Sequence, residues 1–277
     1  MTGPRVILTR PAGQAAQWLQ VLQAQGLRGL QACNFPLIEI SDALAPAQRA
    51  ALHARAAQTA VCMWVSANAV DYFFKPNSPV AQGNAAQAAI KNIVSTDSVT
   101  ALAGQRHWAT GPGTVAALLQ HGLPSAQIDA PDAQAAQWDT EALWLRVHRQ
   151  IQSGTAVLIL RGEDIGTPSA SRDWLATQVR AAGGTVEFAA VYQRRAPQWS
   201  AAQTAWAQAA AADGSVWVFS SSQALAHLPV VGSGWGQARC VATHPRIAQA
   251  AHTAGFGVVC TSRPEATEVV QSIKSML

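Results

Sequence analysis

Long apolar segments are missing from this 277-residue sequence. Its apolar runs, such as residues 157–160, have the length of a strand, whereas a membrane-spanning helix needs about 20 apolar residues. The N-terminus has neither the basic start nor the longer apolar run of a signal peptide, and it passes almost directly into an expected strand at residues 5–9. We therefore expect a cytoplasmic protein that has no membrane partner.

Cysteine is scarce, and patterns that bind metals or phosphate are absent. The four cysteines lie far apart without a C-x-x-C pair, and the seven histidines form no H-E-x-x-H. Neither a Walker-type phosphate loop nor a G-x-S-x-G nucleophile turn occurs. The simplest interpretation of the cysteines is reduced, buried thiols, and the sequence predicts no metal site.

Charge is also sparse. Charged residues make up 12% of the chain, and 19 Lys and Arg against 15 Asp and Glu give a net charge of +4 without a basic run. Nucleic-acid binders usually concentrate positive charge in a patch, so we expect no nucleic-acid partner. A mild positive balance suits an anionic small ligand.

What the sequence does contain is an alternation of short β-branched strands with alanine-rich helices. The length and a hydrophobic content of 49% predict two domains, each with its own core. Continuously apolar strands are typical of parallel sheets covered on both faces, and glycines such as Gly26, Gly122 and Gly255 end helical runs. We predict an α/β fold of two similar three-layer domains with parallel sheets. Strands are expected at residues 5–9, 62–66, 107–110, 156–161, 185–191, 215–220, 239–243 and 257–261. Helices are expected at residues 14–25, 68–74, 114–121, 140–150, 171–182, 201–211, 245–254 and 265–276, with a loop or weak helix at 75–99.

An internal repeat indicates that the two domains are alike. Residues 6–10, which end in Arg10, resemble residues 157–161, which end in Arg161. Residues 63–70 then resemble 217–225, and residues 109–114 resemble 242–247. The same units thus occur twice in the same order, although chance similarity among α/β units is the alternative.

Hydroxyl side chains recur where an expected strand meets an expected helix, at Thr9, Ser66 and Ser220. In open α/β sheets such positions line the crevice at the carboxyl ends of the strands, and helix N-termini there bind anions. The same residue types cap helices, which explains any single one without a ligand. Their recurrence in both halves favours anion binding.

Three further features each allow two interpretations. Arg10 and Arg161 suit substrate carboxylates or surface salt bridges equally well. Tyr192 is either a proton donor in the crevice between the domains or an amphipathic strand residue. Residues 111–116 fit a G-x-G-x-x-A dinucleotide fingerprint, but residues 243–246 in the other half have lost both glycines, so a rigid helix start at Pro112 is preferred.

The ordered set of these motifs resembles the uroporphyrinogen-III synthase family over essentially the whole chain. The matching segments are residues 8–11 with Gln14, then 35–40, 64–70, 110–114, 139–143, 159–162, 191–194 and 219–222.

The resemblance implies two α/β domains joined by a pair of antiparallel linker strands, at residues 35–40 and 189–195. One domain would be discontinuous, formed by residues 1–36 and 196–277, and the other would span residues 41–188.

The resemblance also implies a reaction, that of a cyclising hydro-lyase. The linear tetrapyrrole hydroxymethylbilane loses its terminal hydroxyl as water, its last pyrrole ring is inverted through a spiro intermediate, and the ring closes to uroporphyrinogen III. No cofactor is implied, and a monomer is expected, with at most transient contact with the preceding enzyme of the pathway. Tyr192 would assist departure of the hydroxyl. The substrate contacts implied are Thr9, Arg10, Ser66, Ala67, Asn68, Thr110, Gly111, Thr114, Arg161, Gly162, Ser220, Ser221 and His244.

One turn departs from the family pattern. Many members have a Gly-Pro-Thr-Thr type turn where this chain has His244, Pro245 and Arg246. The change removes a hydroxyl, and His244 or Arg246 is expected to replace it as a donor to a carboxylate. Two alternatives from other classes are a two-domain anion-binding protein without chemistry and a nucleotide-dependent oxidoreductase.

Overall fold

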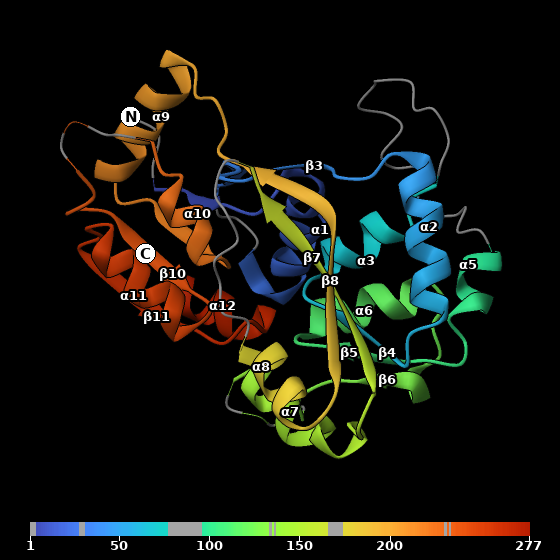
Figure 1. Cartoon of the computed structure of the whole chain (residues 1–277). Helices are drawn as coiled ribbons and strands as arrows, with labels where there is room; N and C mark the ends of the chain where they lie inside the picture. Colours follow the sequence, from blue (N-terminus) through green and yellow to red (C-terminus); the bar gives the residue numbers. More distant parts are fainter. Residues whose placement is uncertain are drawn as a thin grey trace. The chain divides into compact units, whose positions relative to one another are not determined.

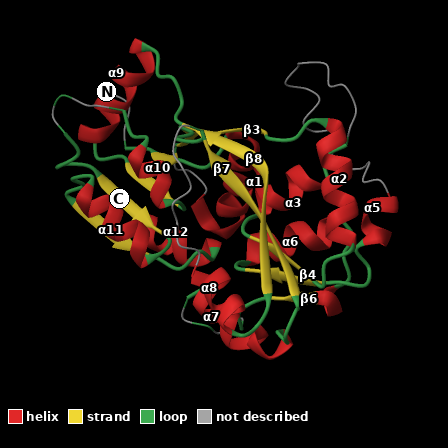
Figure 2. Ribbon diagram, in the orientation of Figure 1, coloured by secondary structure: helices red, strands yellow, loops and turns green. Residues whose placement is uncertain are grey.

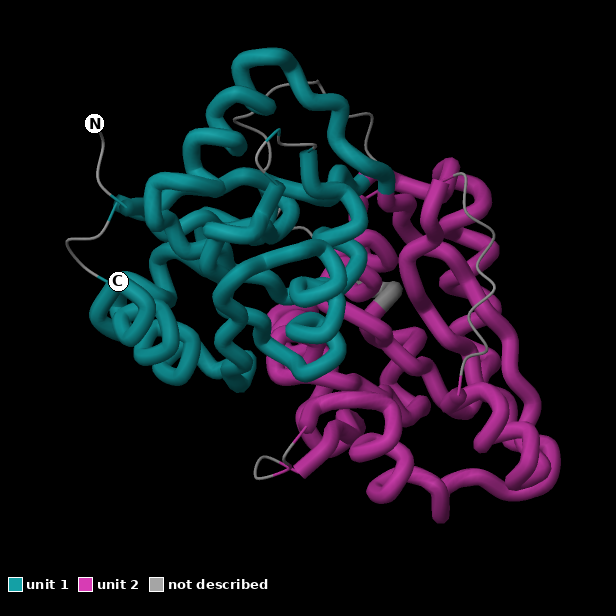
Figure 3. Tube along the Cα trace, turned by 90° about the vertical axis from the view of Figure 1, so that its left-hand side faces the viewer, with its two compact units in different colours: residues 1–40, 195–277 teal, residues 41–194 magenta. Residues whose placement is uncertain are grey.

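The computed structural model describes residues 4–27, 31–76, 96–132, 135, 137–165, 174–229, 232 and 234–277. The chain forms two compact units, the first from residues 1–40 and 195–277 and the second from residues 41–194 (Figure 3). The chain thus leaves the first unit and returns to it later. Over the described ranges, no helix is both long enough and apolar enough to cross a membrane.

The first unit is built on a five-stranded parallel sheet in the order β11-β10-β9-β1-β2. Alternate residues of its strands enter two separate cores, so that Ile7 and Trp217 are buried on one face and Val6 and Val216 on the other. This two-sided burial is the reason that the strands are continuously apolar. The strands are β1 Val6–Leu8, β2 Ala32–Asn34, β9 Val216–Phe219, β10 Arg239–Ala242 and β11 Val258–Thr261. The helices are α1 Ala12–Leu22 with a π-helical turn at Gln23–Leu27, α9 Ala201–Ala212, α10 Ser222–Ala226, α11 Pro245–Thr253 and α12 Ala266–Lys274.

The second unit is built on a six-stranded sheet in the order β3-β8-β7-β4-β5-β6, with β7 and β8 as its longest strands (Figures 1 and 2). On one face, Met63 and Ile159 are buried against Leu143 of α7 and Leu175 of α8. On the other face, the Trp64 ring meets Phe73 of α3 edge-on, with centroids 5.1 Å apart. The strands are β3 Glu39–Asp42, β4 Val61–Trp64, β5 Arg106–Ala109, β6 Ile128–Asp129, β7 Ala156–Asp164 and β8 Thr185–Arg195. The helices are α2 Pro46–Ala57, α3 Ala67–Phe73, α5 Thr96–Ala101, α6 Pro112–Gln120, α7 Thr140–Val147 and α8 Trp174–Ala181, with 3₁₀ turns at Ser125–Gln127 and His148–Gln150.

The strand orders of the two sheets confirm the internal repeat. Read from β2, the first sheet runs β2-β1-β9-β10-β11, and the second runs β8-β7-β4-β5-β6 with β3 added at its edge. The strands that resemble each other in sequence therefore occupy the same places. The predicted α/β fold of two similar parallel-sheet units is confirmed.

Some expected boundaries are wrong. Residues 35–40 were expected to form one strand, but strands run at Ala32–Asn34 and Glu39–Asp42 and leave residues 35–38 between them. Helix α2 was not predicted, although Pro46 at its first position and the alanine-rich run that follows are ordinary helix signals. Residues 171–173 of an expected helix, and residues 77–95 of the expected loop, lie outside the described residues.

Candidate active site

Two helices of the second unit begin where neighbouring strands end. Ser66 follows β4 and is the N-cap of α3, where its Oγ accepts a hydrogen bond from the Ala69 amide at 3.2 Å. Thr110 follows the adjacent strand β5, and its hydroxyl donates to the Val65 carbonyl at 3.4 Å. Hydroxyl groups thus gather at the carboxyl edge of this sheet, where open α/β proteins bind their ligands.

The remaining predicted contacts on these two helices occupy their first turns. Ala67 and Asn68 are half-buried at the start of α3. Gly111 is the N-cap of α6 in extended conformation, with Pro112 at the first helical position and Thr114 buried behind it. The glycine-rich segment is therefore a proline-initiated helix start, as the preferred interpretation of its sequence holds.

Tyr192 of β8 reaches the Ser66 hydroxyl. The two oxygens are 3.1 Å apart, and either one can be the donor. Tyr192 is 3% exposed, and its ring centroid lies 5.7 Å from that of Tyr72 on α3. The sequence contains two tyrosines, so both lie at this one place. A buried phenol that is hydrogen-bonded to a half-buried serine is suited to hold and deliver a proton.

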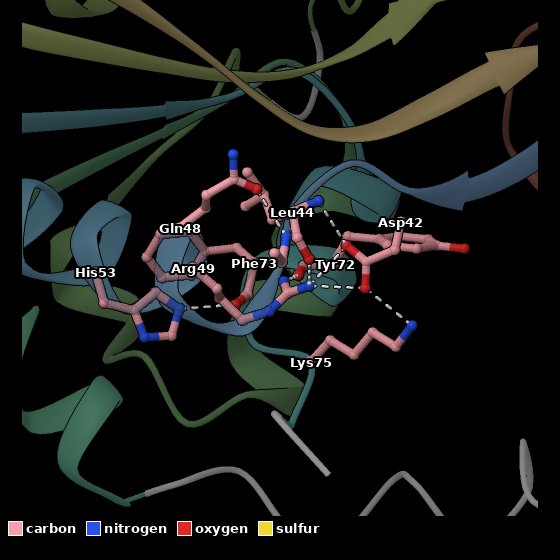
Figure 4. Close-up of polar contacts among 9 residues, drawn as sticks. Asp42, Leu44, Gln48, Arg49, His53, Tyr72, Phe73 and Lys75 are labelled. Atoms are coloured by element: carbon pink, nitrogen blue, oxygen red, sulfur yellow. Dashed lines mark hydrogen bonds and ion pairs between the residues drawn. The ribbon is translucent and has the colours of Figure 1, made fainter. Parts of the chain in front are cut away.

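Behind Tyr72 lies a charged cluster, formed by Asp42, Arg49 and Lys75 (Figure 4). Arg49 of α2 donates from Nη2 to both Asp42 oxygens, at 2.6 and 2.7 Å, and from Nη1 to the Tyr72 carbonyl. Lys75 donates to Asp42 Oδ2 at 3.0 Å, and its Nζ lies 5.5 Å from the Tyr72 ring centroid. Burial acts to raise the pKa of Asp42, but hydrogen bonds from Leu44 and Lys75 and the charge of Arg49 lower it overall. The cluster anchors the end of α3 that carries Tyr72.

Arg161 and Gly162 are neighbours in β7 but have different surroundings. The Arg161 guanidinium carbon lies 4.3 Å from the ring centroid of Phe188, which packs against the core shared with α7 and α8. Gly162 is instead paired with Tyr192. The structure thus brings together Ser66, Gly162 and Tyr192, whereas the Arg161 guanidinium lies at Phe188.

In the first unit, the predicted residues again follow strand ends. The Thr9 hydroxyl is buried and donates to the Val218 carbonyl at 2.7 Å, which ties β1 to β9. Arg10 stacks over Trp18 at 4.3 Å, and burial lowers its pKa to about 10.

The other predicted residues of the first unit lie at the starts of α10 and α11. Ser220 and Ser221 are half-buried just before α10. His244 caps α11, where its Nδ1 accepts a hydrogen bond from the Arg246 amide at 3.1 Å. The imidazole thus fills the capping role that Ser, Thr, Asn or Asp commonly fills at the first position of a helix.

The predicted site residues did not include Asp42, Arg49, Tyr72 and Lys75. One available signal was that the chain has only two tyrosines; a second was the start of α2 at Pro46. Within the described ranges, no three His, Cys, Asp or Glu side chains form a group that could hold a metal ion.

These observations define a class: a two-unit α/β protein with matched parallel sheets and a hydroxyl-lined strand edge in each unit. The chain belongs to the uroporphyrinogen-III synthase family, because the family model described as uroporphyrinogen-III synthase HemD matches residues 20–271. Members of this family are hydro-lyases of tetrapyrrole biosynthesis.

Solved structures of the family have the same fold. A mutant uroporphyrinogen III synthase from the extremely thermophilic bacterium Thermus thermophilus matches with a TM-score of 0.54 and 13% identity, over 99% of this chain and 98% of that one. The uroporphyrinogen-III synthetase from Helicobacter pylori matches with a TM-score of 0.51 and 12% identity, over 98% of both chains. No curated protein matches the chain.

Proposed function

We propose that this chain converts hydroxymethylbilane to uroporphyrinogen III, with Tyr192 as the proton donor that allows the terminal hydroxyl to leave as water. The observation that carries the proposal is the 3.1 Å contact between the Tyr192 hydroxyl and Ser66 Oγ at the carboxyl edge of the second sheet. Family membership supplies the substrate and the overall reaction.

The hydroxyl pair is arranged as a short relay. Ser66 Oγ accepts from the Ala69 amide, and it has a second lone pair for the Tyr192 proton. The Ser66 proton is then free to be donated outward, and Ser66 is the more exposed of the two residues. When the carbon–oxygen bond of the substrate breaks, its electron pair leaves with the hydroxyl, which takes the serine proton and becomes water. Tyr192 re-protonates Ser66 and becomes a phenolate, while the electron pair of the pyrrole nitrogen, which keeps its proton, forms the cationic azafulvenium.

The transient phenolate is stabilised locally. The Arg194 guanidinium carbon lies 5.9 Å from the Tyr192 ring centroid, and Arg194 is fixed by a 2.9 Å hydrogen bond to Asp164. A positive group held near a developing negative charge costs no reorganisation when the reaction occurs. The proton released as the macrocycle closes restores Tyr192.

The substrate is rich in carboxylates, and the strand ends offer partners for them. In the second unit the predicted partners that lie at the carboxyl edge of the sheet are Ser66, Ala67, Asn68, Thr110, Gly111 and Thr114. Of the other two predicted contacts, Arg161 lies over the Phe188 ring and Gly162 against the Tyr192 ring. In the first unit, Thr9, Arg10, Ser220, Ser221 and His244 stay predicted substrate contacts. Catalysis then consists largely of holding a flexible chain in one folded geometry. We propose that the protein acts as a cytoplasmic monomer without a cofactor, in transient contact at most with the preceding enzyme.

The test is the identity of the product isomer. Freshly made hydroxymethylbilane is incubated with and without the protein, oxidised, and separated by chromatography. Without an enzyme, the bilane closes to the type I isomer, and we expect the protein to divert it to type III. Persistent type I product from folded protein would overturn the proposal and favour an anion-binding protein without chemistry.

Tyr192→Phe tests the role of the phenol. We expect kcat to fall about a hundredfold, the range of a lost general acid, with KM little changed. Tyr72→Phe is the matched control, because it removes the other phenol and keeps the ring.

A further inference from the structure

The strand that carries Tyr192 contains a β-bulge immediately before it. In the parallel pair of β7 and β8, Arg161 lies opposite Ala190, but the next residue, Gly162, lies opposite Tyr192. Val191 is therefore an extra residue in β8. Side chains alternate along a strand, so one extra residue moves every later side chain to the other face of the sheet.

The two faces of the sheet differ in what covers them. Phe188 packs with the core shared with α7 and α8. Without the bulge, Tyr192 would follow Phe188 and Ala190 onto that face. With the bulge, its ring lies against Tyr72 and its hydroxyl against Ser66, both at α3. The bulge thus decides whether the phenol meets the serine.

Gly162 provides the space that the ring occupies. A Cβ atom at residue 162 would overlap the Cε2 and Cζ atoms of Tyr192 and stand 2.8 Å from its hydroxyl oxygen. Gly162 is not among the glycines with positive φ, so its backbone conformation does not require glycine. The close approach of the Tyr192 ring is the reason that no side chain fits there.

We propose that Gly162 and the bulge at Val191 are a positioning device for Tyr192. The ring is held between the bare backbone at Gly162 and the Tyr72 ring, and this fixes the hydroxyl at Ser66. Gly162 is a positioning residue in this proposal, in place of the substrate contact that the family resemblance implies. The placement of the Tyr192 ring by Gly162 is the geometric part of this proposal, and it is independent of the proposed function. The effect of that placement on catalysis rests on the proposed function.

The geometric part is tested without substrate. Because the chain has two tyrosines, labelling with tyrosine enriched in ¹³C at Cζ gives two signals, which Tyr72→Phe assigns. We expect Gly162→Ala to shift the Tyr192 signal. Gly104→Ala is the matched control in the same unit, because a Cβ there meets nothing within 4 Å and its φ is not positive. An unchanged Tyr192 signal in folded Gly162→Ala protein would overturn the proposal.

A double variant covers the case in which Gly162→Ala does not fold. Tyr192→Ala removes the ring that a side chain at 162 would strike. We expect Gly162→Ala combined with Tyr192→Ala to have the same thermal midpoint as Tyr192→Ala alone. A further loss in the double variant would mean that the ring is not what requires the glycine, and the proposal would be wrong.

The catalytic consequence is tested by a kinetic cycle. A displacement of about 1 Å costs on the order of a hundredfold in rate, so we expect Gly162→Ala to lower kcat by that factor and to leave KM within about twofold. In the Tyr192→Phe background, the same glycine substitution is expected to cause no further loss of kcat. If the kcat losses of Gly162→Ala and Tyr192→Phe multiply in the double variant, Gly162 does not act by positioning the phenol. Failure of the wild-type protein to form type III product would refute the proposed function alone, since the tyrosine signals still decide the geometry.

Discussion

Replacing Arg49 by methionine would remove the guanidinium that joins three parts of the second unit. The Arg49 side chain is 3% exposed and donates to the Asp42 carboxylate of β3, to the Tyr72 carbonyl of α3 and, at 3.5 Å, to the Leu44 carbonyl. Methionine fills the volume of the aliphatic stem, so the variant tests the polar head rather than the packing.

The expected magnitude follows from what the substitution leaves behind. Breaking a buried ion pair costs about 3–5 kcal/mol when the remaining charge is stranded. Asp42 is not fully stranded, because Lys75 still donates to it at 3.0 Å, the Leu44 amide donates at 3.1 Å, and its side chain is 29% exposed. The Tyr72 carbonyl loses its Arg49 partner, at a cost of about 1 kcal/mol. We therefore expect Arg49→Met to lower the free energy of unfolding by about 3 kcal/mol.

The same helix offers a matched control. Arg55 of α2 also pairs with a carboxylate, that of Glu187 at 2.7 Å, but the two side chains are 46% and 55% exposed. An exposed pair contributes at most about 0.5–1 kcal/mol, so Arg55→Met is expected to change stability little. Urea unfolding followed by circular dichroism measures both variants. Equal losses at the two positions would refute the reasoning, because burial is the property that separates them.

Three further outcomes are expected. Ser66→Ala removes the cap of α3 and the hydrogen-bond partner of the Tyr192 phenol. It should lower the free energy of unfolding by about 1 kcal/mol and lower kcat as well, and Ser66→Thr should restore both. Steady-state kinetics that show an unchanged kcat in Ser66→Ala would exclude the relay. Burial lowers the pKa of His107 to about 4 from its ordinary 6.5, so the unfolded chain binds the proton first and stability should fall by about 3 kcal/mol as pH drops from about 7 to 4. In His107→Gln, the urea midpoint should depend much less on pH over this range. An unchanged pH dependence would mean that His107 is not the group responsible. Burial raises the pKa of Cys62 and Cys240 to about 12, so a thiol reagent at pH 8 should modify half-buried Cys260 first; mass spectrometry that finds Cys62 modified equally fast without denaturant would contradict this.

Much of the candidate site was visible in local patterns of the sequence. A serine between an apolar strand and a helical run is an N-cap wherever it occurs, and Ser66 is one. The repeat of strand motifs predicted two similar domains, because the same local units fold in the same way, and the matching strand orders agree with that. Tyr192 was predicted as a site residue because tyrosine is rare in this chain and because it follows an apolar run. The neighbouring residues in the sequence do not determine which face of the sheet its side chain occupies.

What the sequence alone determined is the set of elements and their order: strands buried on both faces, helices between them, and hydroxyls at the strand ends. These features depend on side-chain periodicity and on residues a few positions apart. Tertiary structure alone decided the register of β7 against β8, because one extra residue at Val191 is recognisable only once the partner strand is in place. It also decided that Arg49 of α2 meets Asp42 of β3 and the Tyr72 carbonyl. Those contacts join segments from different elements, and hydrogen bonds and close packing between them form only when the chain has folded.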